Sequence, residues 1–278
     1  VKRDVVRLVT PGTLTEETLL EARQHNFLAS FAKMRNECAL AWVDISTGGL
    51  WVEQIPLVKL GPELARVKPS EMLVPEALYE DVVEIAEDLS CSLTPLSASA
   101  FDSVSGDARI KSLFCVETLD SFGQFERVEV STLGALIDYL QITQKGKLPL
   151  LKIPQRQFAS KIMQIDAATR RNLEVTRTLG GASQGSLLST IDRTVTASGA
   201  RLLEQRLSSP SLDVNEIKGR LDSIDDMCAD SGVRQDIRKI LRKVPDLERA
   251  LSRISLERGG PRDIGNIRSG LVQAQQIY

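Results

Sequence analysis

The sequence has few of the side chains on which enzyme chemistry most often depends. His25 is the only histidine among 278 residues, and Cys38, Cys91, Cys115 and Cys228 include no Cys-x-x-Cys pair. Catalytic triads and zinc sites built from histidine and paired cysteine are therefore poorly supported. Scattered thiols without a secretory signal are typical of reduced side chains in a cytosolic protein, so we expect a cytoplasmic location.

Long apolar runs and aromatic clusters are also missing. No stretch reaches the roughly 18 apolar residues that a membrane-spanning helix needs. Aromatic residues make up 4% of the chain and are scattered, so no stacking platform for nucleic acid is evident. With 42% hydrophobic and 26% charged residues, the chain has the composition of an ordinary globular protein and enough length for two domains.

Charge is distributed unevenly between the two halves. Residues 1–148 carry an excess of acidic groups, whereas residues 149–278 carry an excess of basic groups. A basic second half is compatible with binding phosphate. The simpler interpretation is that these arginines lie on solvated helix faces.

The first half is typical of a mixed α/β domain. We predict strands over Asn26–Ala32, Cys38–Ile45 and Leu50–Gln54, with a tight hairpin at Ser46-Thr47-Gly48-Gly49. The second of these runs is apolar on both faces, which predicts a central strand covered on both sides.

Helices and one further strand follow in this half. Pro62–Arg66 and Pro75–Leu89 are predicted to be helical, with Glu71–Val74 as a strand between them. Ser97–Ser105 is predicted to be a loop, and Ser131 is a candidate cap for a helix that ends before residue 148, where we place the domain boundary.

The second half is almost entirely helical by pattern. Apolar residues recur at helical spacing in successive segments, and Ser208-Ser209-Pro210 and Gly259-Gly260-Pro261 interrupt them. Asp213 with Glu216 resembles a capping box. Helices joined by short loops must pack together to bury such stripes, which predicts a helical bundle.

Two patterns suggest chemistry and are better explained by structure. Asp44 on a central strand could hold a catalytic metal, but no carboxylate or histidine cluster reinforces it. A role in the turn, accepting backbone N–H bonds, is the better interpretation. Gly180 to Gly185 has the glycine spacing of a phosphate loop, but it lacks the lysine and the preceding strand, so a helix–helix connection is predicted.

Several segments, in order, resemble the MutS family of bacterial mismatch-repair proteins. Asp166–Glu174, Asp192–Pro210 and Val244–Leu271 are similar to the first part of that family's helical core, or lever, domain. Val9–Thr13 is similar to the segment that leaves its mismatch-binding domain, and Asp44–Gly48 to the hairpin of its connector domain. The chain is therefore identified as a fragment of a member of this family.

The resemblance implies a fold and a division into domains. It implies an α/β domain followed by an all-α one. Residues 1–12 would be a linker from a mismatch-binding domain, 13–148 an RNase H-like connector without nuclease activity, and 149–278 the first part of the helical lever. Because a later segment completes the lever in the family, stripes such as Val233, Ile237 and Ile240 are expected to be partly uncovered and to promote self-association.

The resemblance also implies a function that is not catalytic. The fragment lacks the Phe-x-Glu mismatch motif and the Walker A lysine, so we expect neither mismatch recognition nor ATP hydrolysis from it, no catalytic or metal-binding residue, and no cofactor. In the whole protein, ATP and Mg, mismatched duplex DNA, a MutL-type partner and a second subunit would be bound, and these helices would couple the sites. Arg109, Lys111 and Phe114, in a loop and turn from Phe101 to Phe114, are the candidate partner contacts.

Two other functions stay open at this point. An RNase H-like, metal-dependent nuclease with a helical accessory domain would use Asp44. A helical adaptor that binds only protein would need none of these sites.

Overall fold

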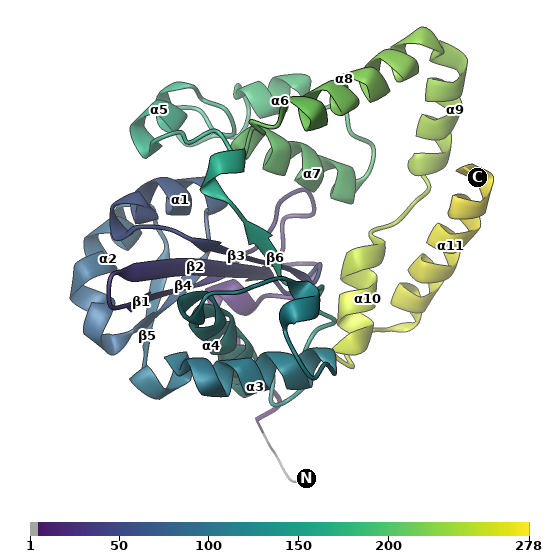
Figure 1. The fold of residues 1–278 in the computed structure, drawn as a ribbon. Coiled ribbons are helices and arrows are strands. Elements are labelled where there is room, and N and C mark those ends of the chain that lie inside the picture. Colours follow the sequence, from purple (N-terminus) through teal and green to yellow (C-terminus); the bar gives the residue numbers. More distant parts are fainter. Residues whose placement is uncertain (1–4, 278) are drawn as a thin grey trace. The chain divides into compact units, whose positions relative to one another are not determined.

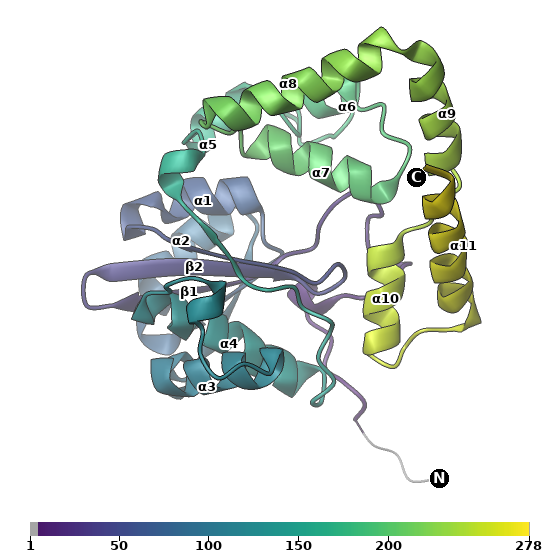
Figure 2. The same cartoon turned by 45° about the vertical axis from the view of Figure 1, so that its right-hand side comes forward.

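The computed structural model describes residues 5–277, which form two compact units. The αβ unit comprises residues up to Leu20 and Asn26–Phe158, and the helical unit comprises Glu21–His25 and the residues from Ala159 onward. Figures 1 and 2 show a sheet with helices on both faces in the first unit and helices alone, apart from one isolated β-bridge, in the second. No helix in the described part of the chain is long and apolar enough to cross a membrane.

The αβ unit is built on a mixed six-stranded sheet in the order β5-β4-β1-β2-β3-β6. The neighbours β1–β2 and β2–β3 are antiparallel, and the pairs β1–β4, β4–β5 and β3–β6 are parallel. The strands are β1 (Leu28–Met34), β2 (Glu37–Asp44), β3 (Gly49–Gln54), β4 (Glu71–Pro75), β5 (Ser92–Leu96) and β6 (Gln155–Gln157).

Strand β2 is central and buried on both faces, as its apolar run predicts. Ala39, Ala41 and Val43 face one core, whereas Leu40 and Trp42 face the other. The first core lies under α3 (Ser103–Phe114) and α4 (Arg127–Thr143), and the second under α1 (Leu60–Val67) and α2 (Tyr79–Asp88). The predicted sheet with helices on it is therefore confirmed as three layers.

The hairpin between β2 and β3 forms where it is predicted. Gly48 has a positive φ of 76°, and its N–H donates to the carbonyl of Asp44 at 2.8 Å. A side chain at this glycine would be strained and would also meet the Leu150 carbonyl. The register then pairs Trp42 with Trp51 across the two strands.

The predicted capping role of Ser131 is wrong. Helix α4 begins at Arg127, where Glu126 and Glu129 form a reciprocal capping box. Ser131 lies inside the helix, and its hydroxyl donates to the carbonyl of Phe101 at 2.5 Å. The loop predicted over Ser97–Ser105 is wrong at both its ends, since a 3-10 turn covers Ala98–Phe101 and α3 begins at Ser103.

The boundary between the units lies later than the predicted residue 148. Strand β6 pairs with β3 and extends the αβ unit to Phe158. All residues of β6 are polar, so the alternation of apolar and polar residues that predicts a strand is absent there.

The helical unit contains seven helices among its described residues. They are α5 (Ala167–Asn172), α6 (Leu187–Ile191), α7 (Ala197–Ser208), α8 (Val214–Ala229), α9 (Ser231–Leu241), α10 (Leu247–Ser255) and α11 (Pro261–Ile277). Asp213 caps α8 as predicted, by accepting bonds from the N–H groups of Asn215 and Glu216. The reciprocal bond of a capping box is not formed, since the Asp213 N–H donates to the Ser211 hydroxyl, which in turn donates to Glu216. The break predicted at Gly259–Pro261 separates α10 from α11, and these two helices pack together.

Candidate interaction site

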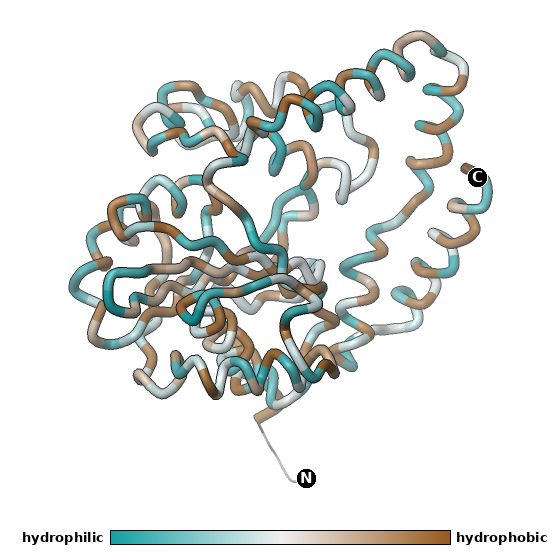
Figure 3. Tube along the Cα trace, in the orientation of Figure 1, coloured by the Kyte–Doolittle hydropathy of each residue, from teal (hydrophilic) through white to brown (hydrophobic). Residues whose placement is uncertain are grey.

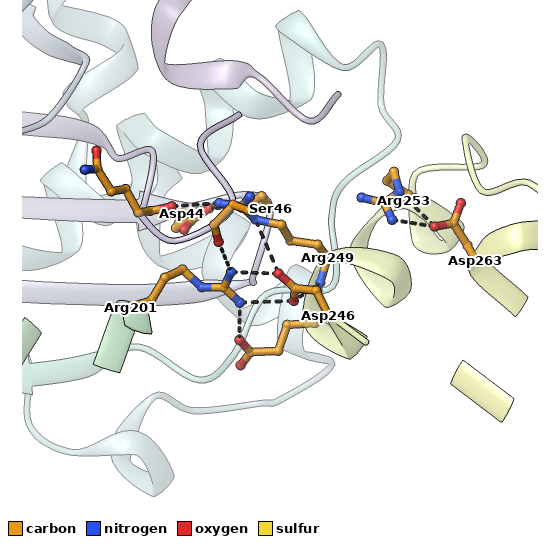
Figure 4. A network of polar contacts seen from close by, with 10 residues as sticks. Asp44, Ser46, Arg201, Asp246, Arg249, Arg253 and Asp263 are labelled. Atoms are coloured by element: carbon orange, nitrogen blue, oxygen red, sulfur yellow. Dashed lines mark hydrogen bonds and ion pairs between the residues drawn. The ribbon is translucent and has the colours of Figure 1, made fainter. Parts of the chain in front are cut away.

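Asp44 is committed to the hairpin and is not arranged as a metal ligand. Its Oδ1 accepts bonds from the Ser46 N–H at 2.9 Å and from the Ser46 hydroxyl at 2.6 Å (Figure 4). The carboxylate is fully buried. The turn-stabilising role predicted for Asp44 is therefore confirmed. Within residues 5–277, no three histidine, cysteine, aspartate or glutamate side chains gather as a metal site.

A second buried polar cluster joins β3, α1 and β6. Arg66 donates to Glu63 Oε2 at 2.5 Å and to Glu53 Oε2 at 3.0 Å, and its guanidinium lies 5.1 Å from the Trp42 ring centre. It also reaches Gln157 at 3.3 Å. Burial, together with the nearby charge of Glu63, raises the pKa of Glu53 to about 7, although Arg66 acts to lower it. This cluster has two acids for one base and attaches β6 to the rest of the sheet.

Glu71 ties the early turn Pro11–Thr13 to the sheet. Its Oε2 accepts from the Gly12 N–H at 3.0 Å, and its Oε1 accepts from the hydroxyls of Thr94 and Tyr139, both at 2.7 Å. The side chain is almost fully buried. Four segments of the αβ unit therefore meet at the carboxylate of Glu71, whose two oxygens are both hydrogen-bonded. The bond to Gly12 explains why the end of the predicted linker, residues 1–12, belongs to this unit.

The candidate partner residues lie on a helix, so their predicted placement in a loop and turn is wrong. Asp102 caps α3 by accepting a bond from the Ser105 N–H at 2.8 Å. The serine- and alanine-rich stretch before α3 obscures its start, because serine and aspartate favour both turns and helix caps.

Helix α3 packs unusually close to α4. A Cβ at Gly134 would lie 2.4 Å from the Gly106 Cα, and a Cβ at Gly106 would lie 2.8 Å from the Val130 carbonyl oxygen. Only glycine at both positions permits this approach. The close contact fixes which face of α3 is turned outward.

The three candidate residues divide into two kinds. Arg109 forms an ion pair with Asp138 at 3.0 Å, and Phe114 packs edge-on against Phe122 with ring centres 5.4 Å apart. Lys111 is partly exposed and pairs with Asp107 at 2.6 Å one helical turn away. Arg109 and Phe114 thus hold α3 in place, and Lys111 lies nearer the outer face.

A shallow hollow lies beside the edge strand β6. It is lined by Phe122, Gly123, Gln124, Pro154, Gln155, Arg156 and Phe158. Arg156 is held there by Glu129 at 2.8 Å and by the Gln124 carbonyl at 2.8 Å, and its guanidinium lies 5.3 Å from the Phe158 ring centre. Polar and aromatic side chains line the hollow, and the charge of Arg156 is balanced by Glu129.

In the helical unit, the segment Asp166–Glu174 serves the packing of helix ends. Asp166 caps α5 through the Thr169 N–H at 2.9 Å. Arg170 is buried and donates to the Ser208 carbonyl at 2.9 Å, which satisfies the end of α7. The glycine-rich stretch that follows connects α5 to α6, as predicted.

Buried arginines are the main feature that sequence reasoning missed. Arg170, Arg201 and Arg249 are all buried, so for these three the interpretation as solvated surface residues is wrong. Arg201 binds both oxygens of Asp246, at 2.7 and 3.0 Å, and also Glu248 at 3.3 Å (Figure 4). Burial acts to lower the pKa of Arg201, but the bonds and charges of Asp246 and Glu248 outweigh it and raise that pKa. No local pattern signals a partner 45 residues away.

Comparison with known proteins identifies both units. The family described as MutS domain II matches residues 26–152, and the family described as MutS domain III matches residues 168–278. The chain is similar over its entire length to "DNA mismatch repair protein MutS" of Cereibacter sphaeroides, with 57% identity over 277 residues.

Two further relatives carry the same name. The protein of Roseobacter denitrificans is 56% identical over 284 residues, and that of Paracoccus denitrificans is 55% identical over 277 residues. In each case the whole chain is covered, but only 31% or 32% of the relative. The chain thus spans about a third of the length of the relatives that it matches.

Proposed function

The chain belongs to the MutS family, within which it comprises the connector (II) and lever (III) domains, and from this premise we propose that it transmits conformational change in a DNA mismatch-repair protein. The observation that carries the proposal is the match to both domains, in order, over residues 26–152 and 168–278. In this role the αβ unit and the helical unit couple events at a DNA site to events at a nucleotide site. Such coupling is reciprocal, because each ligand changes the affinity for the other by the same factor.

The side chains of the chain support a mechanical function better than a catalytic one. The carboxylate most plausible as a metal ligand, Asp44, accepts two bonds inside the hairpin. The other buried acids of the αβ unit described above are likewise bonded within the fold: Glu53, Glu63, Glu71 and Glu129. We therefore propose that ATP, Mg and mismatched duplex DNA act through the whole protein, together with a second subunit, and not through a site in these two domains.

We further propose that the outer face of α3 contacts a MutL-type repair protein. Val104 is largely exposed there, and Lys111 is partly exposed on the same helix. Arg109 and Phe114 support this face from below through Asp138 and Phe122. An apolar residue beside a charged one on a rigid helix is a suitable contact for a protein partner.

The partner contact is tested by capture of a MutL-type protein on the immobilised chain. Val104→Glu and Lys111→Glu should each weaken binding by about tenfold, since each places an unmatched charge in the interface. Glu87→Lys, at an exposed position of α2 on the other face of the sheet, is the matched charge-changing control and should bind like the parent. Equal binding by all four proteins would contradict this contact.

The absence of a site for ligand chemistry is tested separately. We expect matched and mismatched duplexes to give the same weak, salt-dependent binding curve, and ATP with Mg to leave the melting temperature unchanged. A strong preference for the mismatched duplex would contradict the proposal. Cleavage of an RNA–DNA hybrid with Mg or Mn that is lost in Asp44→Asn would replace it with a nuclease function.

A further inference from the structure

A short segment before β1 belongs to the helical unit, although residues on both sides of it belong to the αβ unit. This segment is Glu21–His25. The chain consequently passes from one unit to the other at three places, after Leu20, after His25 and after Phe158. Residues 26–158 are therefore flanked at both ends by chain that is part of the helical unit.

Two buried arginines hold the backbone of this segment. Arg201 on α7 donates from Nη1 to the Ala22 carbonyl at 2.9 Å, and Arg249 on α10 donates from Nη2 to the Gln24 carbonyl at 2.7 Å. Their exposed fractions are 1% and 4%. Backbone carbonyls that accept bonds from buried guanidinium groups are strongly fixed, because these bonds are charge-assisted.

The carboxylate of Asp246 lies between the two arginines and contacts both. Asp246 accepts two bonds from Arg201, lies 3.9 Å from Arg249 Nε, and caps α10 through the Arg249 N–H (Figure 4). Glu248 also binds Arg201. Two guanidinium groups thus face two carboxylates, so the closed cluster is electrically balanced. Loss of Asp246 leaves the buried guanidinium groups of Arg201 and Arg249 without the carboxylate that they share, which is costly.

A third contact lies at the edge of this cluster. Arg23, within the segment, donates to Asp192 and to the Thr194 hydroxyl, both at 2.6 Å. Asp192 and Thr194 belong to the turn that leads into α7. Because Arg23 is half exposed, water weakens this contact, and the buried pair of arginines contributes most of the attachment.

We propose that Arg201, Arg249 and Asp246 form a latch that fastens residues 21–25 to the helical unit, so that the αβ unit is tethered on both sides of this segment as well as after Phe158. A body tethered at several points has fewer ways to turn than a body tethered at one point. The closed latch therefore restricts reorientation of the αβ unit, and its opening releases that unit. This property concerns the chain alone and goes beyond the proposed function.

Two native cysteines allow the test without new labelling sites. Cys115 in the αβ unit and Cys228 in the helical unit are exposed. Cys38 and Cys91 are buried, and burial raises the pKa of both thiols, that of Cys91 to about 12. Spin labels that react with thiolates should attach to the exposed pair. The distribution of distances between the two labels then reports how freely the units reorient.

The variants are chosen to open the latch without removing a helix cap. Asp246→Asn keeps a residue that caps α10 well but removes the charge that balances Arg201. Arg249→Gln removes the bond to the Gln24 carbonyl. The matched control is Arg253→Gln, which breaks the ion pair between Arg253 and Asp263 in the same unit without touching the latch (Figure 4).

Both latch variants should broaden the distance distribution and accelerate amide hydrogen exchange in residues 21–25 by about tenfold or more. The control should leave both as in the parent chain. An unchanged distribution in both latch variants would overturn the proposal, as would equal broadening in Arg253→Gln.

If the latch variants lose helical circular dichroism, Arg23→Gln decides the question. It should raise exchange in residues 21–25 by a small factor at most while exchange in α7 stays constant. An increase of about tenfold or more would overturn the proposal, because the exposed Arg23 and not the buried pair would then hold the segment. The measurements use no DNA, nucleotide or partner, so their outcome is separate from that of the proposed function.

Discussion

The two units differ in where their apolar side chains lie. In the αβ unit, β2 is sandwiched between two buried cores, and Leu133, Leu136 and Leu140 of α4 are inaccessible. In the helical unit, no residue of α8 or α9 is buried. Figure 3 shows hydrophobic residues recurring along α8, which the structure leaves uncovered.

The αβ unit thus buries its apolar side chains within itself, whereas α8 and α9 leave theirs at least partly exposed. Ile217, Leu221 and Ile224 form an exposed apolar stripe on α8. The expectation that Val233, Ile237 and Ile240 are partly uncovered is also confirmed, since the first is exposed and the other two are half-buried. Exposed stripes of this kind mark places where another protein surface packs.

Loss of a leucine side chain gives the largest expected contrast between the regions. Leu133→Ala in α4 should lower the free energy of unfolding by about 3 kcal/mol, because it leaves a cavity in a closed core. Leu221→Ala in α8, where the leucine is 54% exposed, should change it by less than about 0.5 kcal/mol. Urea unfolding is followed by tryptophan fluorescence for the αβ unit and by far-ultraviolet circular dichroism for the whole chain. Equal losses in the two variants would refute the contrast.

Both tryptophans, Trp42 and Trp51, lie in the αβ unit, with ring centres 6.3 Å apart. Their fluorescence therefore reports that unit alone.

Replacement of glycine by alanine should change the free energy of unfolding less than the loss of Leu133 does, and in opposite directions in the two units. Gly134→Ala should destabilise the αβ unit by about 2 kcal/mol, because the new Cβ meets the backbone of Gly106. Gly219→Ala on α8, where nothing lies within 4 Å, should instead stabilise the helix by about 0.5–1 kcal/mol. The same two optical signals distinguish the units. Stabilisation by Gly134→Ala would show that α3 and α4 do not touch.

The smallest expected effect is a pH dependence confined to the αβ unit. The pKa of Glu53 is about 7 in the folded state and about 4.5 in the unfolded state. The folded state therefore binds the proton more tightly, so protonation of Glu53 stabilises the fold and this stability is lost as the pH rises through about 7. Between pH 6 and pH 8 the free energy of unfolding should fall by about 1 kcal/mol from this group.

Glu53→Gln should remove that fall, because the side chain no longer ionises. Glu87→Gln, at an exposed position of α2, is the control and should keep the parental slope. Unfolding curves at three pH values, read by tryptophan fluorescence, make the measurement. A parental slope in Glu53→Gln would show that another group titrates.

Much of the fold could be predicted from local pattern. Strand β2 is recognisable because it is apolar on both faces, and the hairpin because Ser46–Gly49 supplies the residues that a tight turn requires. Helix α8 is recognisable from its cap at Asp213 and its stripe. These signals are local, since each depends on residues within one or two turns of the chain.

Less of the candidate sites could be predicted. The sequence does not predict that two of the candidate partner contacts, Arg109 and Phe114, pack against Asp138 and Phe122 inside the unit. Whether Arg109, Lys111 and Phe114 bind a partner stays a prediction. Residue type alone does not distinguish a surface arginine from one that forms an ion pair with the next helix.

Periodicity, turn residues and family-like segments are enough to establish two domains of different class and membership in the MutS family. Only the tertiary structure brings the carbonyls of Ala22 and Gln24 to Arg201 and Arg249. It also buries these arginines, which lie in a basic part of the sequence, so that they bind the backbone of residues 21–25. The reason is physical. Backbone preferences act over a few residues, whereas a buried charge needs a partner that replaces its lost hydration, and that partner can lie far away in the sequence.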